Sequence, residues 1–475
     1  MSPRGASGGR NARGGPTPSA FLIGRPCLYY LCASAGPRSE GTLVCIVCGR
    51  SGPFIDFPAV PDDRQQHEGI EYAAPSECHA SHSPTSPARR SRPIPYPFYA
   101  RLRAEAPVYR IRLALWLSAW LVTRHDDVVF VLKEGPFSNE FSKQKMAWLP
   151  RRFQPLTRHL LNADPPDHIR LRTLVSKAFT PRAVERLRGR MQDICDELLD
   201  AAQSEGRLDL VQDYALPLPL TVIAEMLGIP PQDRRRFHAW TKAVVAGGSG
   251  SVTRFVLGMP ALLQSTHYLR GLIGRRRSEP GEDIVTALLQ AEEAGDKLNE
   301  DEVVGMIALL ILAGYETTMG LVSSGTLALL QHPEQRRRFA TEPELTDSAI
   351  EELLRYTSPL ELAAFRLARE PVTIAGITIP KGDVVLGVLG SANRDESRFP
   401  NPNTLDLARD PNRHLAFGAG AHFCLGAPLA RLEGRIAITT LFRRFPDLRL
   451  AETAKEVPWR RGLFFRGPAR LRVLL

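Results

Sequence analysis

The feature that most constrains the fold is a run of long amphipathic helical patterns between residues 166 and 356. Apolar residues recur there at intervals of three and four, the period of a helix that buries one face. Short alternating segments at 108–112, 120–123 and 371–389 indicate strands. We therefore predict a mainly α-helical fold with small β-sheets (α+β). Shorter helices are predicted from Pro95 and at 126–134, and the long ones at 181–204, 217–227, 231–245, 260–276, 282–293, 300–330, 346–356 and 427–445.

Residues 1–93 differ from everything that follows. They are rich in Gly, Pro, Ser and Arg, contain no lysine, and show neither a helix nor a strand period. Such a segment cannot bury enough apolar surface to offset the entropy of ordering, so we predict a disordered extension, or a misplaced start of translation. A zinc knuckle at Cys45 and Cys48 is an open alternative, although no histidine follows at ligand distance. The folded domain is predicted at 94–475.

Composition limits the class of protein. The 475 residues are 43% hydrophobic, which provides a sizeable core, and five of the seven cysteines precede residue 80. The body keeps only Cys195 and Cys424, which argues for a reducing compartment. The apolar stretch at 21–35 is too short and interrupted to span a membrane. The net charge of +10 is dispersed, which does not favour nucleic-acid binding. We expect a soluble, cytoplasmic, monomeric protein.

The sharpest local signal is a glycine-rich segment around Cys424. It runs Phe417-Gly-Ala-Gly-Ala-His-Phe-Cys424-Leu-Gly426, and a helix with Pro428 in its first turn follows at once. The glycines indicate a tightly turned backbone, and the helix N-terminus favours a thiolate. An iron-ligating cysteine needs both properties. On spacing alone, a free buried cysteine is an equally good interpretation.

The same segment resembles a known family. Six residues match, position for position, the haem-binding loop of the cytochrome P450 family: Phe417, Gly418, Gly420, His422, Cys424 and Gly426. Four further segments resemble motifs of that family in the same order: 164–172, 313–318, 352–355 and 392–395. The resemblance covers about 94–475. It implies the P450 fold in a single large domain, haem b held by this loop with Cys424 as the axial iron ligand, and dioxygen as co-substrate.

The predicted helix at 300–330 carries a local cost at its centre. Gly314 costs about 1 kcal/mol relative to alanine, and the hydroxyl of Thr317 competes for backbone carbonyls. Such a helix is expected to kink, either over a ligand or for packing alone. Glu316 has no evident partner on the same turn, and apolar surroundings would raise its proton affinity. A place at a solvent edge is the alternative for this acid.

The resemblance assigns functions to this helix centre. It implies that Ala313 and Gly314 lie against the haem, and that Thr317 and Glu316 are the catalytic pair that delivers protons during oxygen activation. Tyr315 departs from the smaller residue that is common at its position, which leaves the shape of the substrate pocket open.

Two groups of charged residues complete the predicted site. On spacing alone Glu352 and Arg355 are an ordinary surface ion pair. The resemblance implies a buried structural pair, joined by Arg409, whose loss affects folding and haem retention rather than chemistry. His168 and Arg172 share one helix face, so both can reach one carboxylate, although a solvated face is the usual role of such residues. By resemblance they bind the haem propionates with Arg366 and His422, and His414 is structural.

These motifs predict a haem-thiolate monooxygenase that hydroxylates or epoxidises an apolar organic substrate. We expect the walls of the substrate pocket to come from residues 135–160, 215–280, 313–317 and 360–365. Electrons are expected from a ferredoxin or flavodoxin with an NAD(P)H-dependent reductase, and the net charge of +7 over the body suits an acidic partner. A peroxide-driven or coupling-type member is one alternative, against which the presence of Glu316 and Thr317 argues. A non-catalytic haem-binding paralogue is the other.

Overall fold

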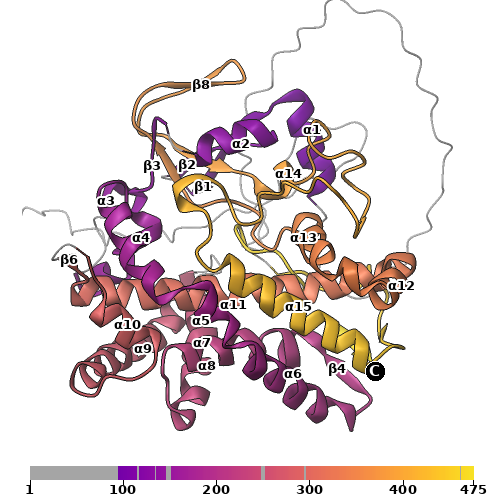
Figure 1. The fold of residues 1–475 in the computed structure, drawn as a ribbon. Coiled ribbons are helices and arrows are strands. Elements are labelled where there is room, and N and C mark those ends of the chain that lie inside the picture. The colour runs from indigo at the N-terminus through magenta and orange to yellow at the C-terminus, as the bar shows by residue number, and fades with distance from the viewer. Residues whose placement is uncertain are drawn as a thin grey trace, which may run out of the picture.

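The computed structural model describes residues 95–114, 117–133, 135–145, 151–247, 252–293, 296–460 and 462–475. The predicted extension, with its zinc-knuckle cysteines, lies outside these residues. A helical part and a smaller part that holds the main sheet lie side by side, and helix α11 runs along their boundary (Figure 1). The helices are α1 (Tyr96–Glu105), α2 (His125–Leu132), α3 (Phe141–Lys145), α4 (Asp167–Ala178), α5 (Pro181–Glu185), α6 (Arg188–Gln203), α7 (Pro217–Met226), α8 (Pro231–Gly247), α9 (Val252–Ser278), α10 (Ile284–Gln290), α11 (Glu300–Gln331), α12 (Pro333–Thr341), α13 (Thr346–Thr357), α14 (Leu389–Ala392) and α15 (Ala427–Arg444).

The main sheet has five strands in the order β1-β2-β10-β7-β3. Its pairs are antiparallel except β10 with β2, which is parallel. This pairing brings the segment after α13 against the N-terminal part of the chain. The strands are β1 (Val108–Ala114), β2 (Leu117–Val122), β3 (Phe137–Ser138), β7 (Arg366–Ala368) and β10 (Val384–Gly387). Smaller sheets contain β4 (Arg207–Asp209), β5 (Glu292–Glu293), β6 (Asp296–Lys297), β8 (Val372–Ile374), β9 (Ile377–Ile379), β11 (Arg449–Leu450) and β12 (Arg472–Leu474).

Helix α11 is the centre of the helical core. Asn299 begins it with a capping box, in which its side chain and that of Glu302 bond each other's backbone N–H. The helix contacts α7, α13 and α15, and the 3₁₀ segment Arg151–Thr157 lies across it. Gly305 allows that crossing, because a Cβ there would collide with the carbonyls of Arg158 and Pro155. The length and composition of α11 would suit a membrane span, but 56% of its apolar window is buried in the protein, as in a core helix of a soluble protein.

The predicted fold class is confirmed, and the local differences from the predicted elements include two predicted helices and one helix that was not predicted. The segment predicted as one helix at 181–204 is two, because the N–H of Leu187 bonds the carbonyl of Val184, three residues back, and tightens the turn between them. The predicted helix at 282–293 is shorter, since Asp283 caps its start and residues 292–293 form β5. Helix α12 was not predicted: Phe339 is its one buried residue, so it lacks an apolar stripe.

Candidate functional site

The cysteine loop has the tight turns that its glycines predict. Gly418 and Gly420 have φ of 71° and 73°, in the left-handed region that favours glycine. A Cβ on Gly420 would lie 2.8 Å from the Cα of Lys133, so the loop packs against the end of α2. The N–H of Cys424 donates to the carbonyl of Phe417 at 3.0 Å, and α15 begins at Ala427. This hydrogen bond closes the loop, and Cys424 lies at its end with an exposed side chain.

Opposing effects act on the Cys424 thiol. Although the side chain is exposed, the protein atoms packed around the sulfur raise its pKa by desolvation. The amides of Gly426 and Ala427 and the charges of Arg172 and Arg431 oppose that rise. The helix N-terminus therefore acts in the predicted direction, but the net shift of the pKa in the protein alone is upward. A cation bound at the sulfur would reverse the balance.

Basic side chains from three separate parts of the chain meet beside the loop. The rings of His168 (α4) and His422 lie 4.0 Å apart between centroids, and Arg366 begins β7. His168 is 2% exposed and Arg366 is 3% exposed. Burial, followed by the charges of His168 and Arg366, lowers the pKa of His422 to about 3. Burial lowers the pKa of Arg366 to about 10. Arg366 therefore holds a buried positive charge beside the two histidine rings.

This cluster fits an anionic group. Within the described part of the chain, Nη1 of Arg366 is buried and has no hydrogen-bond partner, and a buried guanidinium normally has one. Two apolar side chains on the segments of the predicted site are exposed: Leu312 of α11 by 42% and Phe423 of the cysteine loop by 41%. An apolar molecule with carboxylates and a metal for the cysteine would satisfy all three features. Haem has these properties, so the residues present fit it.

Arg172 contacts the backbone of the cysteine loop. Its Nη1 donates to the carbonyls of Phe423 at 2.7 Å and Ala421 at 3.3 Å. These bonds supply donors to carbonyls that the turned loop presents, so Arg172 braces the backbone on either side of His422. That His168 and Arg172 can both reach one carboxylate stays a prediction.

The prediction of an unpaired Glu316 was wrong. The carboxylate is 1% exposed and accepts two hydrogen bonds from the guanidinium of Arg460, one of them at 2.8 Å. Arg460 comes from the C-terminal segment, and its side chain is 25% exposed. Glu316 therefore lies neither alone in apolar surroundings nor at a solvent edge. A buried carboxylate retains its charge at low cost only when a partner compensates it.

The α-helical assignment of α11 continues through Gly314, at the helix centre. The α-helix is unbroken from Glu300 to Gln331, and the hydroxyl of Thr317 donates to the carbonyl of Ala313 at 2.7 Å. A Cβ on Gly314 would touch only Ile223, at 3.9 Å. The cost of glycine is therefore not explained by crowding among the described residues. Tyr315 is buried, and burial together with Glu316 raises the pKa of its hydroxyl.

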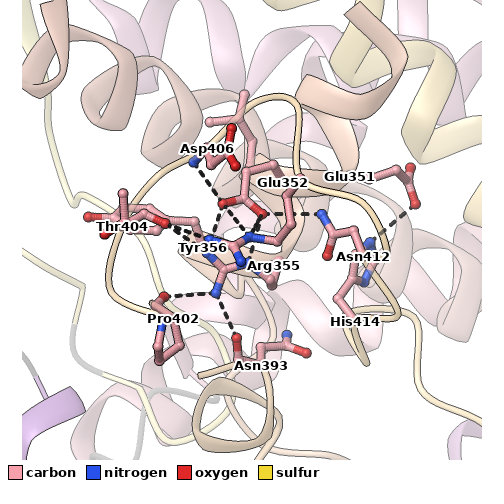
Figure 2. Close-up of polar contacts among 12 residues, drawn as sticks. Glu351, Glu352, Arg355, Tyr356, Asn393, Pro402, Thr404, Asp406, Asn412 and His414 are labelled. Atoms are coloured by element: carbon pink, nitrogen blue, oxygen red, sulfur yellow. Dashed lines mark hydrogen bonds and ion pairs between the residues drawn. The ribbon is translucent and has the colours of Figure 1, made fainter. Parts of the chain in front are cut away.

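Behind the loop, Glu352 and Arg355 form a buried ion pair (Figure 2). Both side chains are 0% exposed, and Nε of Arg355 lies 2.7 Å from the Glu352 carboxylate. Nε of Arg409 reaches the same carboxylate at 3.1 Å. Arg355 also donates to the carbonyls of Asn393, Pro402 and Thr404. The Asn393 side chain accepts from the N–H of Leu415 at 2.7 Å, which links the pair to the start of the cysteine loop.

His414 and Glu351 extend these contacts toward the loop (Figure 2). Nε2 of His414 lies 3.2 Å from the Glu351 carboxylate, which also binds Arg431 through two hydrogen bonds of 2.7 Å. Burial alone would raise the pKa of Glu351, but Arg431 and His414 bring it down to about 2. The guanidinium of Arg431 lies 4.5 Å from the centroid of the Phe417 ring. His414 thus connects Glu351 to the loop, since its Nδ1 accepts from the N–H of Ala416 at 3.2 Å; its structural role stays a prediction.

Glu433 is a buried acid that the sequence did not point out. It is 2% exposed on α15, accepts a hydrogen bond of 3.0 Å from Thr318 on α11, and burial raises its pKa to about 8.

The raised pKa of Glu433 makes the stability of the protein depend on pH. Because the pKa in the folded state lies above the ordinary value of 4.5, folding favours the protonated acid. Its contribution to the free energy of unfolding is complete below pH 4.5 and is lost as the pH rises toward 8. Relative to Glu433→Gln, the protein should lose about 2–3 kcal/mol of unfolding free energy between pH 5.5 and 7.5. Urea titrations of both proteins at the two pH values measure this; parallel curves would contradict it.

Comparisons with known proteins agree with this geometry. The family model described as Cytochrome P450 matches residues 264–458. The chain is 43% identical over 390 residues to the polyketide biosynthesis cytochrome P450 PksS of Bacillus subtilis, covering 80% of this chain and 96% of the relative. It is 44% identical to the cytochrome P450 monooxygenase PikC of Streptomyces venezuelae, covering 78% and 89%.

Solved structures show the same relationship. The structure of PksS matches with a TM-score of 0.75 over 80% of this chain and 96% of that one. The myxobacterial cytochrome P450 CYP267B1, in complex with myristic acid, matches at 41% identity with a TM-score of 0.75 over 80% of this chain and 96% of that one. Shared sequence over nearly the whole of these relatives, the shared fold and the cysteine loop lead to one conclusion: the chain belongs to the cytochrome P450 family and is a bacterial-type haem-thiolate monooxygenase.

Proposed function

We propose that this monooxygenase uses haem b, with Cys424 as the iron ligand and with His168, Arg172, Arg366 and His422 at the propionates. The observation that carries the proposal is Nη1 of Arg366, which is buried and has no hydrogen-bond partner among the described residues, in a cluster with two histidines beside an exposed cysteine. Thiolate-ligated haem supplies the oxygen-activating chemistry of the family when it is bound. The protein supplies the placement of the group, the charges that hold it, and protons.

Each part of the loop has a separate task in this proposal. Phe417, Gly418, Gly420 and Gly426 shape the backbone so that the sulfur projects outward. The amides of Gly426 and Ala427 hydrogen-bond the sulfur and moderate its electron donation. Ala313 and Gly314 form the α11 surface on the opposite side of the site. Glu352, Arg355 and Arg409 support the loop from behind.

The proposed substrate is a large, mainly aliphatic organic molecule. Leu312 and Ala313 are exposed at the centre of α11, where such a molecule would cover them. Related proteins are named as a mycinamicin IV hydroxylase/epoxidase and a vitamin D(3) 25-hydroxylase. Solved relatives hold myristic acid and testosterone. We assign hydroxylation or epoxidation of a substrate of this class, in a pocket with walls from the described parts of 135–160 and 215–280 and from 313–317 and 360–365. Residues 146–150 and 248–251 of the predicted walls lie outside the described residues.

Thr317 and Glu316 are proposed to deliver protons from the α11 side. Replacing Thr317 by alanine should lower product formation about 100-fold, while NAD(P)H is still consumed and its electrons reduce dioxygen to peroxide or water. The ratio of product to NAD(P)H consumed measures this effect. Thr341→Ala is the matched control, because that exposed hydroxyl makes the same bond to a carbonyl four residues back. Equal product yields for the two variants would remove Thr317 from the mechanism.

Electrons are proposed to come from an acidic ferredoxin or flavodoxin with its NAD(P)H-dependent reductase, in the cytoplasm. Lys133 lies beside Gly420 and reaches solvent, and Arg431 lies beside Phe417 with its side chain 39% exposed. Such cations attract an acidic partner to the cysteine side of the molecule. The second-order rate of iron reduction by the partner should therefore fall about tenfold or more from low to high ionic strength. A stopped-flow rate that does not depend on salt would exclude electrostatic docking.

A further inference from the structure

Asp164 is a buried carboxylate that the proposed function does not use. It lies three residues before α4 and is 8% exposed. It accepts four hydrogen bonds: from Oγ of Ser138 at 2.5 Å, from the N–H and Nδ2 of Asn139 at 2.8 and 3.0 Å, and from Nη2 of Arg369 at 2.7 Å. Burial alone would raise the pKa of Asp164, but these donors bring it down to about 2. The Asp164 carboxyl is therefore ionised at neutral pH.

The donors to Asp164 belong to the sheet, not to α4. Ser138 ends β3, Asn139 follows it, and Arg369 directly follows β7. A carboxylate before a helix usually caps the free N–H groups of that helix. Here Pro166 occupies the cap position and makes no side-chain cap bond. The side-chain hydrogen bonds described for Asp164 therefore connect α4 to the β3–β7 edge rather than stabilise α4 itself.

These two elements carry the proposed propionate ligands. The N–H of His168 bonds the backbone carbonyl of Asp164 at 2.9 Å, so the two residues belong to the same turn. Arg366 begins β7, three residues before Arg369, and β7 pairs with β3 next to Ser138. The charge of Asp164 also acts on Arg366. One carboxylate thus joins the two backbones from which His168, Arg172 and Arg366 project.

We propose that Asp164 is a positioning residue for haem: it locks α4 to β7 so that the histidine and the two arginines face the propionates at a fixed separation. The inference rests on the proposed function, because it needs these residues to bind propionates. Groups that orient a cofactor's direct ligands typically contribute ten- to a hundredfold to its retention.

The test measures haem loss from the ferric holoenzyme to an excess of apomyoglobin, followed by absorbance. Asp164→Asn keeps the size of the side chain but replaces one acceptor oxygen with an amide, and should lose haem about tenfold faster or more. Asp167→Asn is the matched control: it removes the same charge three residues further on, where the carboxylate is 57% exposed and lies 3.9 Å from Arg170. The rate of haem loss from this control variant should stay within about twofold of the rate from the unchanged protein. Equal rates for the two variants would overturn the inference.

A double variant tests whether Asp164 acts through β7. If it does, Asp164→Asn should add little to the haem loss caused by Arg366→Gln, because the position of an absent guanidinium no longer matters. If Asp164→Asn acted only by lowering the stability of the protein, the increases in haem-loss rate caused by the two substitutions would multiply. That result would overturn the inference. Arg369→Met serves if Asp164→Asn does not fold. It removes one donor from a side chain that is 51% exposed, and should raise haem loss several-fold with a similar dependence on Arg366.

The experiment also separates this inference from the proposed function. If Arg366→Gln leaves the rate of haem loss unchanged, the proposed propionate site is wrong. The positioning role of Asp164 is then refuted as well, because it depends on that site. If Arg366→Gln raises haem loss while Asp164→Asn and Arg369→Met do not, the propionate site stands and only the role of Asp164 is refuted.

Discussion

Cys424→Ala is expected to abolish oxygen activation, and with it all substrate turnover. The sulfur is the proposed iron ligand, and alanine offers no atom that can replace it. The measurement is the absorption spectrum of the reduced protein after addition of carbon monoxide. The unchanged protein should show the strongly red-shifted Soret band of thiolate-ligated haem, and the variant should lack it.

Cys195→Ala is the matched control, because Cys195 is the other cysteine in the described part of the chain. It is 0% exposed in the helical core, and burial raises its pKa to about 12, so it is a neutral thiol. This variant should keep the red-shifted band and its turnover. A Cys424→Ala protein that retains the band would refute the proposed ligand. Well-folded unchanged protein that takes up no haem would refute the site as a whole.

Arg355→Met should destabilise the protein by about 3–5 kcal/mol, a large part of the stability of a typical domain. The substitution leaves the charge of Glu352 buried and incompletely compensated. It also deprives the carbonyls of Asn393, Pro402 and Thr404 of their donor. We expect little soluble protein and low haem content. Urea unfolding of the soluble fraction gives the free energy.

A pair on the preceding helix provides the control for that prediction. Glu334 and Arg337 have the same spacing and a contact of 2.7 Å, but their side chains are 67% and 63% exposed. Arg337→Met should therefore cost no more than about 1 kcal/mol. Removing both buried charges with Glu352→Leu and Arg355→Met should recover part of the loss, because no unpaired charge remains. Equal costs for the buried and the exposed arginine would contradict the structural role.

The parts of the site that could be predicted from the sequence are those encoded by neighbouring residues. The glycines around Cys424 and the start of α15 lie within one short segment, so the loop and its turns followed from spacing. Glu352 and Arg355 are three residues apart on one helix, which predicts their contact. Their burial followed from the family resemblance and not from the spacing, because an exposed pair has the same pattern.

Contacts between distant segments could not be predicted in the same way. The partner of Glu316 is Arg460, 144 residues further along the chain, and no local pattern distinguishes that arginine from its neighbours. The role of Asp164 was missed although it lies in a recognised motif, since its donors come from Ser138 and Arg369. Helix α12 was missed for a different reason, because its single buried side chain gives no periodic signal.

The close approach of Gly420 to Lys133 has a consequence for the synthesis of the protein. The cysteine loop takes its shape against α2, whereas the cations beside it come from α4 and β7, so the haem site combines segments from residue 133 to residue 424. The ribosome must therefore have synthesised the chain through Cys424 before any such site exists. Nascent chains that end before Cys424 should carry no haem, so uptake of the cofactor follows the synthesis of this loop.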